Sequence, residues 1–369
     1  MTRRFISTLK VGGLTLAGTA LALGLWIGVE FIALRGETPA ITGENGQKLT
    51  RSIATLERIK LGGIEQYVLI RGTDSTKPLL LFLHGGPGMP VMYLAHAFQR
   101  DLENFFVLVH WDRRGAGKSY GACVRSDSLT LRQTLNDTFE LTEHLLTRFG
   151  HHKLFLVAHS WGTLLGLLAV KEHPEYYAAY IGTGQLSADS LRRYLVQRRF
   201  LYNMARAYGD NDLIEWLIGG GPVHEDDLFR YGGGLQGARS FMPILLTGLR
   251  APEYDLFDAL NVPRGASFVA ERMKDDMNGR DFEKHLRVFK VPIYFFLGRH
   301  DYITPSVLAA EYLGSVRAPL KQLVWFEYSA HFPFWEEQRK FTAEMIRIQN
   351  DVTAFQIRHS AGLDIPITN

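Results

Sequence analysis

A serine, an aspartate and a histidine that each follow an apolar run are the residues of this sequence best suited to do chemistry together. They are Ser160, Asp301 and His331. The apolar runs before them are Leu154–Val157, Ile293–Leu297 and Gln322–Phe326. A serine hydroxyl attacks a carbonyl when a histidine accepts its proton and a carboxylate orients that histidine. The three side chains together predict acyl transfer to Ser160.

The neighbours of Ser160 indicate a sharp turn between a strand and a helix. A nucleophile at such a turn needs small residues two positions before and after it, because strand and helix cross closely there. Gly162 meets this need, and Ala158 stands where glycine is usual. Taken singly, Ser160 could cap a helix, Asp301 could belong to a turn and His331 could be a structural loop residue. Their order along the chain is that of the α/β-hydrolase fold and favours the catalytic interpretation.

A glycine-rich segment could stabilise the negative charge that develops during acyl transfer. Residues 84–88 read HGGPG and follow the apolar run Leu79–Leu83. In the α/β-hydrolase fold, the residue after the nucleophile and a residue in the loop after the third strand donate their N–H groups to the oxyanion. We expect these donors to be Trp161 and Gly86. An ordinary glycine-rich turn is the alternative.

A second glycine-rich segment, "GAGKS" at residues 115–119, looks at first like a phosphate-binding loop. In such a loop a first glycine stands five positions before the glycine that precedes the lysine. Here the second glycine is Gly117, and position 112 holds an aspartate, Asp112. A helix should also start at Lys118 to direct its N-terminal dipole at the phosphate, but no helical pattern begins before about Leu129. We therefore expect no nucleotide cofactor.

Apolar runs and helical patterns alternate along most of the chain. Strands are predicted at 79–83, 105–109, 154–157, 177–181, 293–297 and 322–326. Helices are predicted at 129–149, 161–173, 305–314 and 337–358. Continuous apolar strands separated by helices predict a mostly parallel sheet with helices on both faces. Two alternating runs about Gly62 and Gly63 predict a hairpin before this sheet, and the polar residues 36–50 predict a linker.

The alternation stops between residues 185 and 289, where helical patterns rich in Arg, Tyr and Leu predict an inserted helical cap. The expected fold class is thus α/β, with a cap over the sheet. The sequence divides into an N-terminal segment (1–36), a first part of the core (37–184), the cap (185–289) and a second part of the core (290–369).

The composition limits the classes of function. The chain has 369 residues, of which 46% are hydrophobic, and one cysteine, Cys123, so the fold depends on packing and has no internal disulfide. Residues 1–36 hold four of the 41 basic residues and one of the 38 acidic residues, so residues 37–369 hold 37 basic and 37 acidic residues and have no net charge. A neutral body argues against nucleic acid as a partner. No pattern of closely spaced metal ligands appears, and we expect no metal.

The N-terminus predicts a membrane anchor. Arg3, Arg4 and Lys10 precede an uncharged run from Val11 to Val29. A helix of this length approaches the roughly 30 Å hydrocarbon core of a bilayer. The positive flank predicts an N-terminus inside the cell and a catalytic domain on the periplasmic or extracytoplasmic side. The alternative is a signal peptide, cleaved near Ala20–Ala22, and a secreted protein.

Taken as a set, the motifs resemble the proline iminopeptidase (prolyl aminopeptidase) branch of the α/β-hydrolases. The matching segments are His84–Gly88, Asp112-x-Arg114-Gly115-x-Gly117-x-Ser119, Ser160–Gly162, Gly298-Arg299-x-Asp301 and Ser329–His331. The resemblance covers most of residues 50–355 except the cap. It implies that the segment at residue 112 is a structural turn in which Asp112 and Arg114, together with His84, brace the loop carrying Gly86.

The resemblance also implies that acidic cap residues hold the free amine of the substrate. The candidates are Glu215, Glu225 and Glu253. The Trp-Ser-x-Trp-Glu-like segment expected in the cap is missing, and Ala158 is a second departure. The sequence therefore predicts a serine hydrolase that cleaves a small peptide or ester, with release of an N-terminal residue as the main expectation. A carboxylesterase and a catalytically silent binding protein on the same scaffold remain alternatives.

Overall fold

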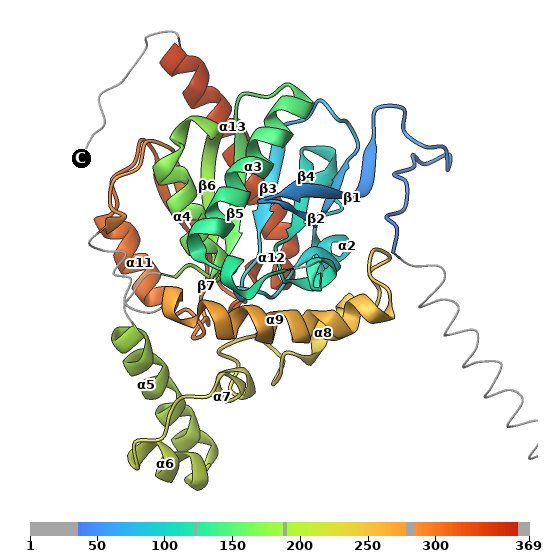
Figure 1. The fold of residues 1–369 in the computed structure, drawn as a ribbon. Helices are drawn as coiled ribbons and strands as arrows, with labels where there is room; N and C mark the ends of the chain where they lie inside the picture. Colours follow the sequence, from blue (N-terminus) through green and yellow to red (C-terminus); the bar gives the residue numbers. More distant parts are fainter. Residues whose placement is uncertain (1–35, 122–123, 187–189, 278–284, 361–369) are drawn as a thin grey trace, which may run out of the picture.

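One sheet of eight strands occupies the centre of the described part of the molecule (Figure 1). This computed structural model describes residues 36–121, 124–186, 190–277 and 285–360. The strands lie in the order β1-β2-β4-β3-β5-β6-β7-β8. Their bounds are β1 Ile53–Leu61, β2 Ile64–Gly72, β3 Leu79–Leu83, β4 Val107–Asp112, β5 Leu154–His159, β6 Tyr177–Thr183, β7 Ile293–Gly298 and β8 Lys321–Phe326.

The antiparallel edge of the sheet is the hairpin predicted from the sequence. β1 and β2 pair antiparallel, and β2 also pairs antiparallel with β4. Gly62 and Gly63 form the turn with φ angles of 52° and 83°, which glycine adopts without strain. The hairpin prediction is confirmed.

The strands from β4 to β8 are parallel, as their continuous apolar sequences predict. The side chains of α3 Leu131–Phe149, α4 Gly162–Glu172 and α11 Ser306–Ser315 pack on one face. Those of α2 Ala95–Phe98, α12 Pro333–Glu336 and α13 Gln338–Ser360 pack on the other. Short turns complete the core: η1 Met92–Leu94, η2 Leu102–Asn104, η3 Gly117–Ser119, η4 Ser126–Ser128 and η5 Pro174–Tyr176. This is the α/β-hydrolase architecture that the sequence predicts.

The cap is inserted between β6 and β7 and lies along one edge of the sheet (Figure 1). Its helices are α5 Ser190–Tyr208, α6 Asn211–Ile218, α7 Glu225–Arg230, α8 Met242–Gly248 and α9 Leu256–Met277. α9 crosses the core closely, because a Cβ at Gly265 would lie 2.5 Å from the carbonyl oxygen of Gly115. A Cβ at Gly88 would likewise lie 2.8 Å from the Cβ of Val269. The cap helix therefore packs directly on the glycine-rich loops of the core.

The segment predicted as a linker is packed against the core. The Arg71 guanidinium donates to the hydroxyl of Thr38 at 2.5 Å and to the carbonyl of Pro39 at 2.7 Å. Ile41 is buried. The linker predicted at residues 36–50 thus contains no named helix or strand but is packed on the core, because the buried Arg71 of β2 takes two of its acceptors from it.

The predicted membrane anchor, Val11–Val29, lies outside the described residues. In the part of the chain that the structure describes, no helix is long and apolar enough to cross a membrane.

Candidate active site

Ser160 occupies a strained turn between β5 and α4. Its φ angle is 53°, and it is the one non-glycine residue among those described with a positive φ. Its N–H donates to the carbonyl of Thr183 at 3.0 Å, which ties the turn to the end of β6. A Cβ at Gly162 would collide with the carbonyl oxygens of Leu83 and His84. The small residue predicted two positions after the serine is thus required by the close crossing of α4 over β3.

Ala158, the departure from the usual glycine, faces another glycine across the same crossing. A Cβ at Gly166 of α4 would lie 3.0 Å from the Cβ of Ala158. Because Gly166 has no side chain, the methyl group of Ala158 fits between β5 and α4 without pushing the helix away from the strand.

Asp301 and His331 are directly paired. His331 Nδ1 lies 2.9 Å from Asp301 Oδ2, and both side chains are buried. Thr304 completes this pair. Its amide donates to Asp301 Oδ1 at 2.9 Å, its hydroxyl donates to Asp301 Oδ2 at 2.8 Å, and the same hydroxyl lies 3.2 Å from His331 Nδ1. Sequence reasoning missed Thr304, although an Asp-x-x-Thr spacing is typical of a side chain that accepts a nearby backbone N–H.

The loops that carry Ser160 and His331 meet at the ends of β5 and β6. His159, next to Ser160, donates from Nε2 to the carbonyl of His331 at 2.9 Å, so its contact is structural. A Cβ at Gly184 would lie 2.9 Å from both Cε1 and Nδ1 of His331. The β6 end thus touches the serine turn on one side and the imidazole on the other. Ser160, Asp301 and His331 therefore belong to one cluster at the C-terminal edge of the sheet.

The predicted oxyanion donors lie beside Ser160. A Cβ at Gly85 would be 2.8 Å from Ser160 Cβ, so the glycine-rich loop passes directly over the serine. Gly86 has a φ of 111°, which favours glycine, and it is exposed. Within the described residues, the N–H groups of Gly86 and Trp161 donate to no protein acceptor. Two unused N–H groups near the serine are what stabilisation of an oxyanion requires.

Arg113 braces this glycine-rich loop. Its Nη2 donates to the carbonyls of His84 and Pro87, each at 2.7 Å, and to the carbonyl of Gly85 at 3.2 Å. Its guanidinium also lies 5.0 Å from the ring of Trp161. Burial lowers the pKa of Arg113 to about 9. One buried side chain thus holds both segments that carry the predicted oxyanion donors.

His84 belongs to the same network, as the prediction of a bracing role for it requires. Its Nε2 accepts the amide N–H of Arg113 at 3.4 Å, and its Nδ1 lies 2.9 Å from the carbonyl of Gly85. Burial lowers the pKa of His84 well below its usual value, and the Arg113 charge lowers it further. The imidazole is therefore neutral, which suits a hydrogen-bonding role inside the loop.

The predicted bracing of the loop by Asp112 and Arg114 is wrong. Arg114 donates from Nε and Nη2 to the carboxylate of Asp137 on α3, at 2.6 and 2.8 Å. Asp112 accepts the amide N–H of Lys118 at 2.8 Å and the hydroxyl of Tyr254. β4 ends at Asp112, and in the turn that follows Arg113 faces the glycine-rich loop, whereas Arg114 faces α3 and Asp112 faces Lys118 and Tyr254.

Asp112 and Lys118 connect the core to the cap. Burial raises the pKa of Asp112 to about 7, although its hydrogen bonds from Tyr254 and Lys118 oppose this. Lys118 Nζ donates to the carbonyl of Glu253 at 2.9 Å and pairs with the carboxylate of Asp258. The loop that resembles a phosphate-binding loop thus gives its lysine amide to a protein carboxylate and its lysine side chain to α9.

Of the three acidic cap residues predicted to hold an amine, only Glu225 interacts with the cluster. Glu225 is the first residue of α7 and is accessible to solvent, yet desolvation raises its pKa. Its carboxylate interacts electrostatically with His331 and Asp301. Glu215 is exposed on α6. Glu253 is buried, and its Oε1 pairs with His96 Nε2 at 2.6 Å. The structure therefore does not bring Glu215 or Glu253 to the site.

The electrostatics of the cluster suit a general base. Burial by itself lowers the pKa of His331, but the charge and hydrogen bond of Asp301 raise it, and the net pKa lies above its ordinary value. Glu225 and Glu336 contribute in the same direction. Glu336, which sequence reasoning missed, accepts the amide N–H groups of Ala330 and Phe332 at 2.9 and 3.1 Å. Desolvation raises the pKa of Glu336 to about 7.

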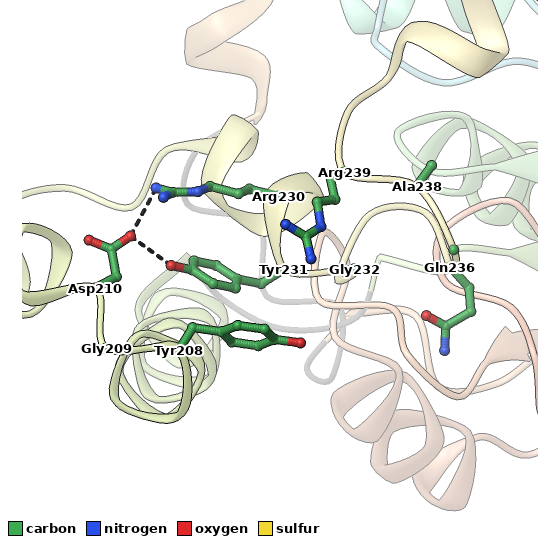
Figure 2. Close-up of a pocket in the computed structure, with 10 residues that line it drawn as sticks. Tyr208, Gly209, Asp210, Arg230, Tyr231, Gly232, Gln236, Ala238 and Arg239 are labelled. Atoms are coloured by element: carbon green, nitrogen blue, oxygen red, sulfur yellow. Dashed lines mark hydrogen bonds and ion pairs between the residues drawn. The ribbon is translucent and has the colours of Figure 1, made fainter.

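A pocket in the cap is lined by the end of α5, the end of α7 and the loop that follows α7 (Figure 2). Figure 2 shows Asp210 bonded to Arg230 at 2.9 Å and to the hydroxyl of Tyr231 at 2.7 Å, with Arg239 across from them. The glycine loop that follows Tyr231 contacts the core, because the carbonyl of Gly234 accepts the His331 amide N–H at 3.1 Å.

Within the described residues, no three His, Cys, Asp or Glu side chains are grouped so that they could hold a metal ion.

Comparisons with known proteins show the family to which the chain belongs. Residues 80–345 match the model of the alpha/beta hydrolase family. A probable aminopeptidase, YbaC of Bacillus subtilis (strain 168), is 30% identical over 312 residues, which cover 80% of this chain and 96% of YbaC. A proline iminopeptidase of Thermoplasma volcanium is 23% identical over 298 residues, 78% of this chain and 94% of that protein.

Solved structures show the same fold. The proline iminopeptidase of Mycobacterium smegmatis superposes with a TM-score of 0.60 at 18% identity, and the match covers 81% of this chain and 99% of that one. A membrane phospholipase A, a bacterial virulence factor, superposes with a TM-score of 0.59 at 16% identity over 96% of this chain and 99% of that one.

Proposed function

Because the chain belongs to the alpha/beta hydrolase family, we propose that Ser160, His331 and Asp301 act as nucleophile, general base and orienting carboxylate of a serine hydrolase. The paired Asp301 and His331, which lie beside the strained turn of Ser160, support these roles. Gly86 and Trp161 supply the oxyanion N–H groups.

The reaction proceeds in two halves. Ser160 Oγ attacks the substrate carbonyl while His331 accepts the hydroxyl proton, and the N–H groups of Gly86 and Trp161 stabilise the oxyanion. The bond to the leaving group then breaks, His331 gives its proton to that group, and an acyl-serine remains. Water attacks the acyl-serine, gives its proton to His331, and the carboxylic acid leaves as Ser160 recovers its proton.

The substrate class is a peptide or amide with a free amino terminus, and its N-terminal residue is released. The observation that carries this assignment is the position of Glu225, which begins α7 and is accessible. The loop after α7 is tied to the cluster, because the carbonyls of Gly233 and Gly234 accept the amide N–H groups of Tyr302 at 2.8 Å and His331 at 3.1 Å. The charge of Glu225 also raises the pKa of His331. In this proposal the substrate ammonium binds Glu225 and the carbonyl of the N-terminal residue meets Ser160. The two relatives named as a probable aminopeptidase and a proline iminopeptidase support the same class. An ester substrate needs no such carboxylate.

Initial rates of the full-length protein on five substrates test this proposal. The substrates are the free prolyl and alanyl arylamides, the N-blocked prolyl arylamide, and two short-chain p-nitrophenyl esters. We expect turnover of a free arylamide that is lost when the amine is blocked. Turnover of esters alone identifies a carboxylesterase instead. The Ser160→Ala variant is the control, and equal rates of that variant and wild type refute the assignment of the nucleophile.

A fluorophosphonate probe distinguishes an enzyme from a silent binding protein. It should label wild type but not Ser160→Ala, because it reacts only with an activated serine. Absence of labelling in wild type would favour the binding protein.

We also propose that Val11–Val29 anchors the protein in a membrane with the catalytic domain on the extracytoplasmic side. The length of this run and the basic residues before it support the anchor. Carbonate-washed membranes should retain the protein, and protease added outside intact protoplasts or spheroplasts should digest it. Recovery of a shortened, freely released chain would favour a cleaved signal peptide.

A further inference from the structure

The end of the cap nearest the start of the described chain exposes an unusual set of apolar side chains. They are Met242, Leu245, Leu246, Leu249, Leu256 and Phe257, and we call them the α8–α9 apolar face. Leu246 is 54% exposed and Phe257 is 62% exposed. Large apolar side chains that gather on one surface mark a contact with another protein or with lipid.

The spacing on α8 shows that this exposure is systematic. Four of the side chains, from Met242 to Leu249, recur at intervals of three and four residues and so form one stripe along the helix. The opposite side of α8 already packs on the core, because Ile244 is buried and Gly248 lies against the ring of Tyr93. A helix that is apolar on both sides needs an apolar medium on each. Met242 and Leu246 of the outer stripe are 53% and 54% exposed among the described residues.

The charges around this face suit a lipid surface. Arg250, in the turn between α8 and α9, and Arg264, on α9, are exposed in the same segment of the chain. The acidic residues of the same segment are occupied inside the protein. Glu253 is buried against His96, Asp258 pairs with Lys118, and Asp255 accepts the amide N–H of Asp258 at 2.8 Å. An apolar face with a basic rim binds the head-group and acyl boundary of membranes that contain anionic lipid.

The described chain begins at this same face. The N–H of Gly36 donates to the carbonyl of Pro252, in the turn between α8 and α9, at 2.8 Å. Figure 1 shows the first described residues, in blue, beside this turn. The apolar run that ends at Val29 is seven residues before Gly36. Seven residues span at most about 25 Å, so the run cannot be far from the α8–α9 apolar face.

We propose that the α8–α9 apolar face docks on the membrane in which Val11–Val29 is anchored, with its apolar side chains at the head-group boundary and its arginines on anionic head groups. The inference rests on the proposed anchor and adds a second contact. Docking holds α9 at a defined orientation to the bilayer. Because Val269 of α9 packs on Gly88, the glycine-rich loop at residues 84–88 takes the same orientation.

Fluorescence quenching by lipid tests the docking. The full-length chain in a Cys123→Ser background carries one environment-sensitive fluorophore at Leu246→Cys, at Phe257→Cys or at Ile357→Cys. Ile357 is the matched control, because it is an exposed apolar residue, 65% accessible, on α13 at the far end of the molecule. Each labelled protein is reconstituted into vesicles of phosphatidylethanolamine and phosphatidylglycerol, with or without brominated acyl chains.

We expect brominated lipid to remove most of the fluorescence at positions 246 and 257 and to leave position 357 unchanged. A protein that floats with vesicles but is equally unquenched at all three positions keeps the anchor and overturns the docking. A protein that does not float overturns both. Blue-shifted emission at 246 without quenching by bromine shows that a second copy or the N-terminal segment covers the face, and also overturns the docking. None of these readouts depends on hydrolysis, so they stand apart from the test of catalysis.

Discussion

The carboxylate of Glu225 acts on the imidazole of His331 across the boundary between the cap and the core. Glu225 begins α7, whereas His331 follows β8, and the interaction raises the pKa of the histidine while the histidine lowers that of the glutamate. One cap residue thus influences both the proposed base and the proposed site for a substrate amine.

We predict that Glu225→Gln moves the acid limb of the pH profile of kcat/KM to lower pH. His331 must be neutral to accept the proton of Ser160, so activity rises as the pH increases through the pKa of His331. Glu225 raises that pKa, and a neutral amide removes this contribution. Because the N-blocked arylamide is not expected to turn over, the limb is measured as the second-order rate constant of labelling by the fluorophosphonate, which has no ammonium group. An acid limb that stays in place contradicts the electrostatic contact.

The same variant should lose activity on substrates with a free amine. Loss of a charge-assisted contact with the substrate ammonium lowers kcat/KM on the free prolyl arylamide by about 10- to 100-fold. Glu215→Gln serves as the matched control, because Glu215 is exposed on α6 and should leave kcat/KM unchanged. An equal loss in the rate of fluorophosphonate labelling, which involves no amine, would mean that Glu225 does not bind the amine.

Arg113 and Arg114 are neighbours with different roles, and matched lysine substitutions should separate them. Arg113→Lys cannot hold three carbonyls of the glycine-rich loop, so we expect kcat to fall by about 10²-fold as the oxyanion donors shift. Arg114→Lys loses the two-point contact with Asp137 and should lower Tm with kcat near that of wild type. Active-site titration with a fluorophosphonate corrects both rates for folded protein. The reverse pattern would restore the prediction from the sequence.

Thr304 is proposed as a positioning residue for Asp301 and His331. Thr304→Val removes the hydroxyl that donates to Asp301 Oδ2, and we expect kcat to fall about 10-fold with little change in KM. Thr304→Ser keeps the hydroxyl and should restore most of the activity. Thr304→Val keeps the methyl group and Thr304→Ser keeps the hydroxyl. If Thr304→Ser is as slow as Thr304→Val, or if Thr304→Val is as fast as wild type, the hydrogen bond alone does not position the pair.

Much of the core could be predicted from the sequence because its signals are local. The predicted strands overlap those observed, and β4 differs because Phe105 is exposed in the turn before Val107. The turn at Ser160 could be predicted for the same reason. The strand, the small residue at Gly162 and the following helix are contiguous, and parallel strands bring their C-terminal ends to one edge of the sheet.

The tertiary structure alone decided which polar neighbours serve the site. The choice between Arg113 and Arg114 depends on the direction of each side chain in the turn after β4, and that direction is set by where the strand ends. The choice of Glu225 over Glu215 and Glu253 depends on how the cap helices pack on the core. Glu336 reaches the His331 loop only because α12 folds back onto it. These contacts join segments far apart in the chain, and their directions follow from packing, whereas residue type and spacing record only local geometry.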